Sequence, residues 1–204
     1  MFTGITMGTF PIVALERGEG RMDLTVGLSA ELREGLKVGA SVAVDGVCLT
    51  VVSWGEQGVL FHAIEETLQR TTLGSLGVGS LVSVERSFQY GQELGGHEVS
   101  GHVIGTGVVA AVHSSGGVHQ LALEVPGDWM RFIFEKGFIA VDGSSLTVGR
   151  VRENGFDLHL IPETVRLTNL GNKGPGDRVN IELDARTVAI VETVERVLAR
   201  RALA

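Results

Sequence analysis

Two segments of this sequence share a polar pattern in which Asp-Gly and two further residues precede Leu-Thr-Val. They are Asp45–Val51, which contains Cys48, and Asp142–Val148, which has Ser145 at the matching position. A thiolate is a nucleophile, and a hydroxyl can donate and accept hydrogen bonds. The pattern predicts two related polar sites that differ at two side chains, where Ser144 and Ser145 correspond to Val47 and Cys48.

A second duplicated pattern places a histidine four residues before Glu-Thr. His62 precedes Glu66-Thr67, and His159 precedes Glu163-Thr164. The amides of a helix start and the threonine hydroxyl could bind ligand hydroxyls or carbonyls. The alternative is a solvated first helical turn without function. The histidines lack the spacing of zinc ligands, so we expect no metal site.

Both patterns belong to an internal repeat with a constant offset of 97 residues (142 − 45). Over this offset Phe61–Glu85 aligns with Leu158–Glu182, and 11 of the 25 aligned residues are identical. Such a repeat is too long for a solenoid unit and indicates two copies of one small domain. We place these domains at residues 1–88 and 98–184.

Composition excludes several classes of protein. The 204 residues carry a net charge of −7, which argues against nucleic acid or an anionic membrane as the main partner. One cysteine allows no internal disulfide and no multi-thiolate metal site. No apolar run reaches the roughly 18 residues of a membrane span, and the first residues do not resemble a signal peptide. We therefore expect a reducing, cytoplasmic location.

The elements that must position these residues are mostly strands. Alternating apolar residues, as in Met22–Leu28 and His119–Val125, indicate strands with one buried face. Each half offers about six such runs, separated by glycine-rich breaks, and six short strands are expected to close into a barrel. Short helices are expected at 30–36, 65–69, 129–134 and 162–166.

The last segment, residues 185–202, is predicted to be one amphipathic helix. Its apolar residues follow a spacing of three and four, at Val188, Val191, Val194, Val197 and Leu198. Asp184 is a suitable N-cap. The apolar stripe must be covered by the chain's own barrels or by other subunits, and the stripe alone does not decide between them.

Several motifs together resemble the riboflavin synthase family of the trimeric α-chain type. They are the opening Met1–Ile5, the run from Gly96 to Val103, the two Asp-Gly segments and Ile161–Thr164. The resemblance extends from residue 1 to about residue 200. It implies two tandem six-stranded Greek-key barrels and a homotrimer joined through the C-terminal helices. It also implies an active site between the N-terminal barrel of one subunit and the C-terminal barrel of its neighbour.

The reaction implied by this resemblance is the dismutation of 6,7-dimethyl-8-ribityllumazine. One molecule transfers a four-carbon unit to a second, which gives riboflavin and 5-amino-6-ribitylamino-uracil without a metal or organic cofactor. Association with lumazine synthase is a further implied possibility. A duplicated barrel suits this reaction, because two copies of one molecule need two sites of similar shape, and positioning both lowers the barrier.

The resemblance also assigns residues. Its catalytic positions match Cys48, His102, Ser145, Thr147, Ser41 and Asp184. Its substrate-binding positions match Gly4, Ile5, Thr6, Val47, Cys48, Leu49, Thr50, His62, Ala63, Ile64, Glu65, Glu66, Thr67, Gly101, His102, Val103, Lys136, Ser144, Ser145, Leu146, His159, Leu160, Ile161, Pro162, Glu163 and Thr164. Cys48 would act as nucleophile or site thiol, and His102 would move a proton at the lumazine's C7 methyl group.

Simpler roles exist for several of these residues. A lone cysteine in a strand is commonly a small buried hydrophobe, and Thr50 and Thr147 suit strands by propensity alone. Asp184 could be only the helix cap. His97 is expected to be structural.

Two other functions compete with the synthase. Lumazine proteins share the fold but only carry a lumazine or flavin, and their second barrel has lost its ligand residues. Here Ser144, Ser145, Thr147 and Lys136 remain, which favours the enzyme. A flavin reductase-like barrel would need a nucleotide-binding domain, for which two barrels leave no room.

Overall fold

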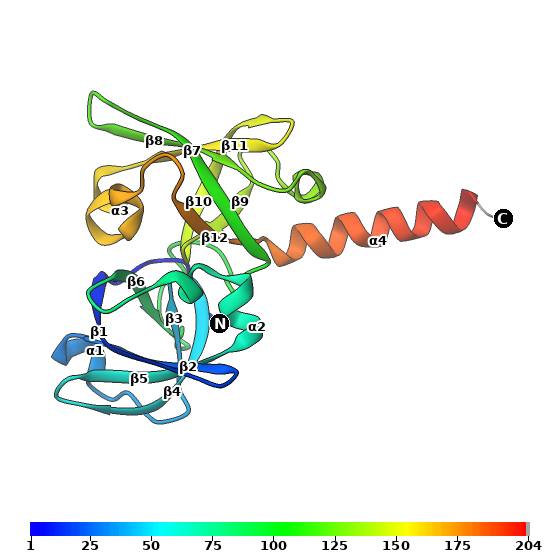
Figure 1. Ribbon diagram of the computed structural model, residues 1–204. Coiled ribbons are helices and arrows are strands. Elements are labelled where there is room, and N and C mark those ends of the chain that lie inside the picture. Colours follow the sequence, from blue (N-terminus) through cyan, green and yellow to red (C-terminus); the bar gives the residue numbers. More distant parts are fainter. Residues whose placement is uncertain (203–204) are drawn as a thin grey trace.

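The computed structural model describes residues 1–202 and shows two closed β-barrels followed by one long helix (Figure 1). The first barrel consists of β1 (Thr9–Gly18), β2 (Arg21–Val26), β3 (Ser41–Val44), β4 (Val47–Gly55), β5 (Gly58–Ile64) and β6 (Leu81–Arg86). The second consists of β7 (Gly105–Ser115), β8 (Val118–Glu124), β9 (Phe138–Val141), β10 (Ser144–Arg152), β11 (Gly155–Leu160) and β12 (Arg178–Leu183).

The two barrels have the same antiparallel strand order. Around the first barrel it is β1-β2-β5-β4-β3-β6, and around the second the six strands follow the same cycle, each number increased by six. β2 pairs with β5 instead of with β3, the next strand in the chain, and β3 lies between β4 and β6. This order is that of a Greek-key connection. The expectation of two tandem six-stranded barrels is confirmed.

Each barrel encloses its own apolar core. Along β2 the fully buried Met22, Leu24 and Val26 alternate with the partly exposed Asp23 and Thr25, so the period-2 pattern corresponds to one inward face. An equivalent cluster fills the second barrel. Closure of each sheet removes the unpaired edges that a small open sheet would expose.

The short helices differ in part from the sequence expectation. They are α1 (Ala30–Arg33), α2 (Glu65–Arg70), α3 (Pro162–Leu167) and the 3₁₀ turns η1 (Thr72–Ser75), η2 (Gly127–Phe132) and η3 (Asn169–Asn172). The helix expected to reach residue 36 ends at Arg33, and Gly35 then turns the chain with a φ of 64°. Its counterpart in the second half is a 3₁₀ turn rather than an α-helix.

The final helix, α4 (Ala185–Ala202), begins where the sequence predicted. Asp184 Oδ1 accepts hydrogen bonds from Thr187 N at 2.8 Å and Thr187 Oγ1 at 2.7 Å, which makes Asp184 the N-cap. Val188 and Val191 pack against the second barrel.

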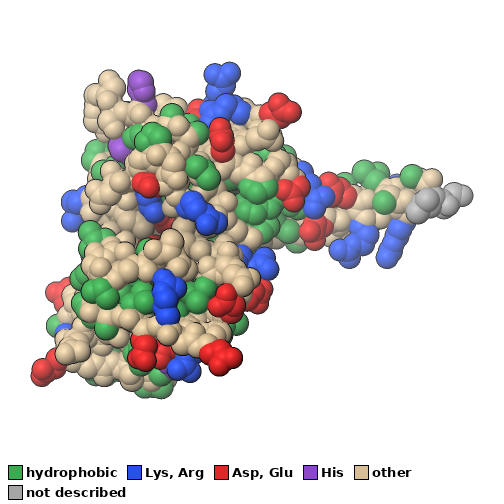
Figure 2. Space-filling view, viewed as in Figure 1, with side chains coloured by type: hydrophobic (Ala, Val, Ile, Leu, Met, Phe, Trp, Pro, Cys, Tyr) green, Lys and Arg blue, Asp and Glu red, His purple; other side chains and the backbone are tan. Residues whose placement is uncertain are grey.

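Arg131 of η2 also donates to Glu195 Oε2 at 2.8 Å, and beyond these contacts α4 projects away from both barrels (Figure 1). Hydrophobic side chains remain uncovered along it (Figure 2), and they include Ile190, Val194, Val197 and Leu198. Within residues 1–202, no helix is long and apolar enough to cross a membrane.

The barrels meet at their two Asp-Gly turns. Gly46 and Gly143 have φ values of 78° and 81°, and a Cβ atom on Gly46 would lie 2.5 Å from Gly143 N. Such a distance excludes any side chain at this contact. Glycine is therefore required both by the positive φ values and by the close approach of the two backbones.

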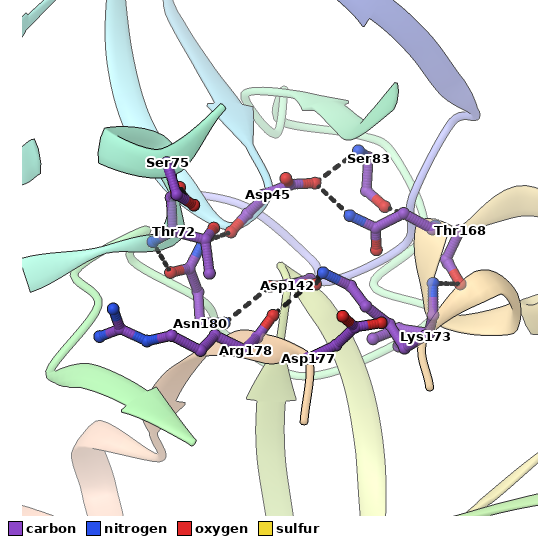
Figure 3. Close-up of polar contacts among 12 residues, drawn as sticks. Asp45, Thr72, Ser75, Ser83, Asp142, Thr168, Lys173, Asp177, Arg178 and Asn180 are labelled. Carbon is purple, nitrogen blue, oxygen red and sulfur yellow. Dashed lines mark hydrogen bonds and ion pairs between the residues drawn. The ribbon is translucent and has the colours of Figure 1, made fainter. Parts of the chain in front are cut away.

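Buried polar groups connect the barrels around this contact (Figure 3). Asp45 Oδ1 accepts from Ser83 N at 2.6 Å in its own barrel and from Asn169 Nδ2 at 2.7 Å in the other. Asn180 Nδ2 donates to Asp45 O at 2.8 Å, and Asn180 Oδ1 accepts from Thr72 N at 2.8 Å. The interface therefore has a defined set of polar partners in addition to its shape.

This interface holds two carboxyl groups close to one lysine. Burial, and then the nearby Asp142, raise the pKa of Asp45 well above its ordinary value. Burial also raises the pKa of Asp142, although Lys173 opposes this effect from 3.3 Å. Burial lowers the pKa of Lys173, but the Asp142 and Asp45 carboxylates outweigh that effect and the net shift is upward.

We predict that the protein loses stability as the pH rises through the folded-state pKa of Asp45. An unfolded aspartate titrates near 3.8, so above this value the folded state retains a proton that the unfolded state has lost. Asp45→Asn keeps the Oδ1 acceptor and cannot ionise. Urea denaturation between about pH 5 and about pH 8 should therefore show a smaller loss of stability for this variant than for the wild type.

The exposed Asp128 provides the control. Asp128→Asn should leave the pH dependence of the wild type unchanged. Equal pH dependence in the wild type and in Asp45→Asn would contradict the prediction.

Candidate functional site

Two pockets lie at equivalent positions on the two barrels, and each is completed by a segment from the other half. The first, here called the N-site, has a volume of about 380 Å³. It is lined by Val47, Cys48, Glu66, Thr67, Arg70 and Thr71 of the first barrel and by Gly101, His102 and Val103 of the segment before β7.

The second pocket, here called the C-site, has a volume of about 180 Å³. It is lined by Ser144, Ser145, Ile161, Glu163, Thr164, Leu167 and Thr168 of the second barrel and by Gly4, Ile5 and Thr6 of the segment before β1. Nearly all of these residues match residues of the N-site under the offset of 97. The chain therefore presents two versions of one pocket.

We call residues 1–8 the first arm and residues 98–104 the second arm. The arms pair with each other through Phe2 and Val99 and then cross to opposite barrels. Ser145 N donates to Gly4 O at 2.8 Å, and Cys48 N donates to Gly101 O at 3.0 Å. The repeat alignment did not indicate this crossing, because it identifies equivalent residues but not the barrel that they contact.

The crossing requires glycine in each arm. Gly4 and Gly101 have φ values of 74° and 80°. A Cβ atom on Gly4 would lie 2.5 Å from Ser145 Cβ, and one on Gly101 would lie 2.6 Å from Cys48 Cβ. These contacts bring the arm backbones directly against the residues whose chemistry the sequence highlighted.

The structure brings about half of the expected site residues together in the two pockets. Those lining the N-site are Val47, Cys48, Glu66, Thr67, Gly101, His102 and Val103, and those lining the C-site are Gly4, Ile5, Thr6, Ser144, Ser145, Ile161, Glu163 and Thr164. His102 precedes β7 and lies in the second arm.

Other expected residues lie outside these pockets. The side chains of Leu49, Ala63, Leu146 and Leu160 are buried in the barrel cores, which leaves only their backbone groups for a ligand. Asp184 caps α4. Exposed or half-exposed positions are occupied by Ser41, Thr50, His62, Ile64, Glu65, Lys136, Thr147, His159 and Pro162.

Some of these outlying residues extend each pocket along an open strand face. Thr50 follows Cys48 on the outward side of β4 and pairs with Ser41 of β3. Thr147 follows Ser145 in the same way on β10 and pairs with Phe138 of β9. Within one chain these faces are open, so a ligand bound there would remain exposed on one side.

His97 contacts the C-site although the sequence indicated only a structural role. Its Nδ1 lies 2.6 Å from Ser145 Oγ, and its ring stacks on Phe138 with centroids 5.1 Å apart. Burial lowers the pKa of His97, which favours the neutral ring, while Asp184 and Glu182 oppose that shift. The N-site has no equivalent histidine, because position 97 precedes the second copy of the repeat.

The two pockets also differ in charge. The N-site carries His102 and Arg70 where the C-site carries Ile5 and Leu167. Ionisable side chains are therefore concentrated in the N-site, whereas the C-site is more apolar. Among the residues described, no group of three or more His, Cys, Asp or Glu could hold a metal ion.

Comparison with known proteins identifies both halves. A model of the "Lumazine binding domain" matches residues 3–87 and 100–184. Riboflavin synthase of Escherichia coli (strain K12) is 46% identical over 202 residues, which cover 98% of this chain and 95% of that protein. Riboflavin synthase of Chlamydia muridarum is 39% identical over 201 residues, which cover 98% of each.

Solved structures show the same fold. A crystal structure of LumP complexed with riboflavin has a TM-score of 0.84 and 24% identity, and the match covers 90% of this chain and all of that one. LumP complexed with 6,7-dimethyl-8-(1'-D-ribityl) lumazine has a TM-score of 0.82 and 22% identity, with 90% and 99% covered.

We predict that Gly101→Ala destabilises the protein through the contact between the second arm and β4. The added Cβ meets Cys48, and overpacking of this kind costs about 1–3 kcal/mol. Gly91→Ala is the control, because Gly91 has a φ of 95° but no atom within 4 Å of an added Cβ. Chemical denaturation should show a larger decrease in the free energy of unfolding for Gly101→Ala than for Gly91→Ala. Equal decreases would show that backbone strain alone is responsible.

Proposed function

The chain belongs to the riboflavin synthase family, and we propose that it converts two molecules of 6,7-dimethyl-8-ribityllumazine into riboflavin and 5-amino-6-ribitylamino-uracil. The observation that carries this proposal is the presence of two equivalent pockets in a chain with full-length riboflavin synthase relatives. A reaction between two copies of one molecule needs two such sites. One lumazine gives up a four-carbon unit and the other accepts it, and the two products together contain every atom of the two substrates.

Two features of the pockets support this reaction. Their corresponding lining positions allow the same ligand to bind in both. Holding two reactants in register can lower the barrier by roughly 7–11 kcal/mol. Their different side chains allow the two copies to react differently. The N-site supplies a thiol and an imidazole, from Cys48 and His102, whereas the C-site supplies the Ser145 hydroxyl with His97 beside it.

Within this proposal each of these side chains has a role. Cys48 is the nucleophile or site thiol for addition at the lumazine's C7, and His102 moves a proton at the acidic C7 methyl group. Ser145, positioned by His97, hydrogen-bonds to the second lumazine. Thr50, Thr147 and Ser41 extend the binding surface along the outward strand faces, and Lys136 extends it from the turn before β9. Asp184 has a defined role as the cap of α4 and is only a secondary candidate for a catalytic residue.

We further propose that the active site forms between subunits of a homotrimer. The open strand faces beside Cys48 and Ser145 would be closed by the opposite barrel of a neighbouring chain. The uncovered apolar face of α4 would hold the subunits together. Residues 1–88 and 98–184 then act as lumazine-binding barrels, and residues 185–202 act as the oligomerisation helix. A cytoplasmic location and association with lumazine synthase belong to the same proposal.

A protein that only carries a lumazine is the less favoured alternative. The LumP structures, at 24% and 22% identity, share the fold. A carrier needs one functional site, whereas this chain has two pockets with polar groups in each. Incubation of the protein with the lumazine distinguishes the two functions.

We expect two molecules of 6,7-dimethyl-8-ribityllumazine to disappear for each riboflavin formed, under anaerobic conditions and without added cofactor or metal. Chromatography of substrate and both products measures the ratio directly. Binding without turnover would support the carrier. A ratio of one to one would contradict the dismutation.

The role of α4 can be tested by placing charge on its uncovered face. Val194→Asp with Leu198→Asp should oppose assembly, because buried unpaired carboxylates are strongly unfavourable. These positions are preferable to Val191, which packs on its own barrel. Sedimentation and turnover, measured on the same samples, should show loss of the trimer together with loss of activity.

The matched control adds the same two charges to the opposite face of the helix, as Ala189→Asp with Ala199→Asp. This variant should assemble and remain active. A Val194→Asp/Leu198→Asp protein that is monomeric yet fully active would exclude a site between subunits.

A further inference from the structure

A buried carboxylate at the end of the first barrel holds the first arm. Glu85 lies near the end of β6, where Oε1 accepts hydrogen bonds from Thr3 N and Thr3 Oγ1, both at 2.7 Å. Its Oε2 accepts from Gly4 N at 2.9 Å. Three donors on one carboxylate, two of them backbone amides, fix the arm more strongly than neutral hydrogen bonds would.

The second half repeats this arrangement at the position 97 residues later. Glu182 of β12 accepts from Ser100 N and Ser100 Oγ, both at 2.7 Å, and from Gly101 N at 2.9 Å. The distances match those around Glu85. The sequence alignment identified these glutamates as equivalent but did not indicate what they bind.

Each arm, bound by the glutamate of one barrel, continues directly to the pocket of the other barrel. Glu85 belongs to the first barrel, yet Gly4 accepts a hydrogen bond from Ser145 N in the C-site. Glu182 belongs to the second barrel, yet Gly101 accepts from Cys48 N in the N-site. In both cases a carboxylate, one arm glycine and one site residue form a continuous chain of hydrogen bonds that crosses between the barrels.

We propose that Glu85 and Glu182 are positioning residues, each of which holds in place the site of the barrel to which it does not belong. Loss of the carboxylate releases the arm, and with it one wall of the opposite pocket. Glu182 therefore positions Gly101 and His102 at the N-site, and Glu85 positions Gly4 and Ile5 at the C-site. This inference rests on the proposed function only in treating the two pockets as substrate sites.

The crossing distinguishes this role from general destabilisation. If Glu182→Gln merely weakened its own barrel, the C-site would be damaged first. If Glu182 positions the second arm, the N-site is damaged while the C-site is retained. Cys48 reports on the N-site without any ligand, because it is the chain's single thiol and lies directly under Gly101.

The first experiment measures the rate at which iodoacetamide alkylates Cys48 in the full-length protein. Release of the second arm uncovers the thiol, so Glu182→Gln should raise this rate roughly tenfold, as expected for loss of hydrogen bonds to a charged group. Glu85→Gln should leave the rate near the wild-type value. Glu19→Gln, an exposed glutamate of the first barrel, is a control for the loss of one charge.

The mirror experiment moves the thiol to the C-site. In a Cys48→Ser/Ser145→Cys background, Glu85→Gln should now raise the alkylation rate and Glu182→Gln should not. Should either Glu variant fail to fold, Thr3→Ala and Ser100→Ala remove only the hydroxyl donor to each carboxylate and should give smaller effects with the same crossed pattern.

Equal increases in the alkylation rate from both glutamate variants, in either background, would overturn the proposal. So would an increase only at the site of the variant's own barrel, or no increase in any variant. Turnover of the lumazine gives a separate reading. Glu85→Gln and Glu182→Gln should each reduce it, and Glu19→Gln should not. If the wild type lacks turnover, the proposed function fails while the crossed alkylation pattern still decides the role of the glutamates.

Discussion

The contact between two Asp-Gly turns is the constraint on which the rest of this structure depends. At this point the backbones of the two halves approach so closely that only glycine fits, at Gly46 and Gly143. This approach fixes the barrels relative to each other and allows the surrounding side chains to pair across the interface. It also brings each β-barrel close enough for the arm of the other half to reach its outward strand face. Both pockets therefore depend on a contact that contains no functional group.

The repeat has diverged where the halves meet and where the chemistry takes place. Thr72 and Ser83 of the first half correspond to Asn169 and Asn180 of the second. The backbone amides of Thr72 and Asn169 donate in the same way to the side chains at the two other positions, but Asn180 also donates through its side chain to Asp45 O and Thr72 Oγ1. Lys173, whose counterpart is Leu76, supplies the cation near two buried carboxyl groups. A duplicated fold thus retains its strands and turns while its contacts become unequal, and unequal contacts allow two similar pockets to perform different tasks.

Features determined by local sequence could be predicted, and features determined by the relation between the halves could not. Period-2 alternation located the strands, and the spacing of valines with Asp184 located α4. The exchange of arms was missed because a repeat alignment assigns Gly4 and Gly101 to equivalent places without saying which barrel they touch. The contact between His97 and Ser145 was missed because His97 has no counterpart in the other half and its position follows from the path of the linker.

The exchange of arms has a consequence for the order in which a ribosome makes this protein. All six strands of the first barrel have emerged once Arg86 is synthesised, yet its pocket lacks a wall until residues 101–103 follow. The wall of the second pocket is made first, as residues 4–6, and has no pocket to close until α3 is complete. Because domains fold as they emerge, the first barrel can form early while neither pocket can bind ligand fully. The lining of the N-site is thus complete once the second arm has been made, and that of the C-site once Thr168 has followed.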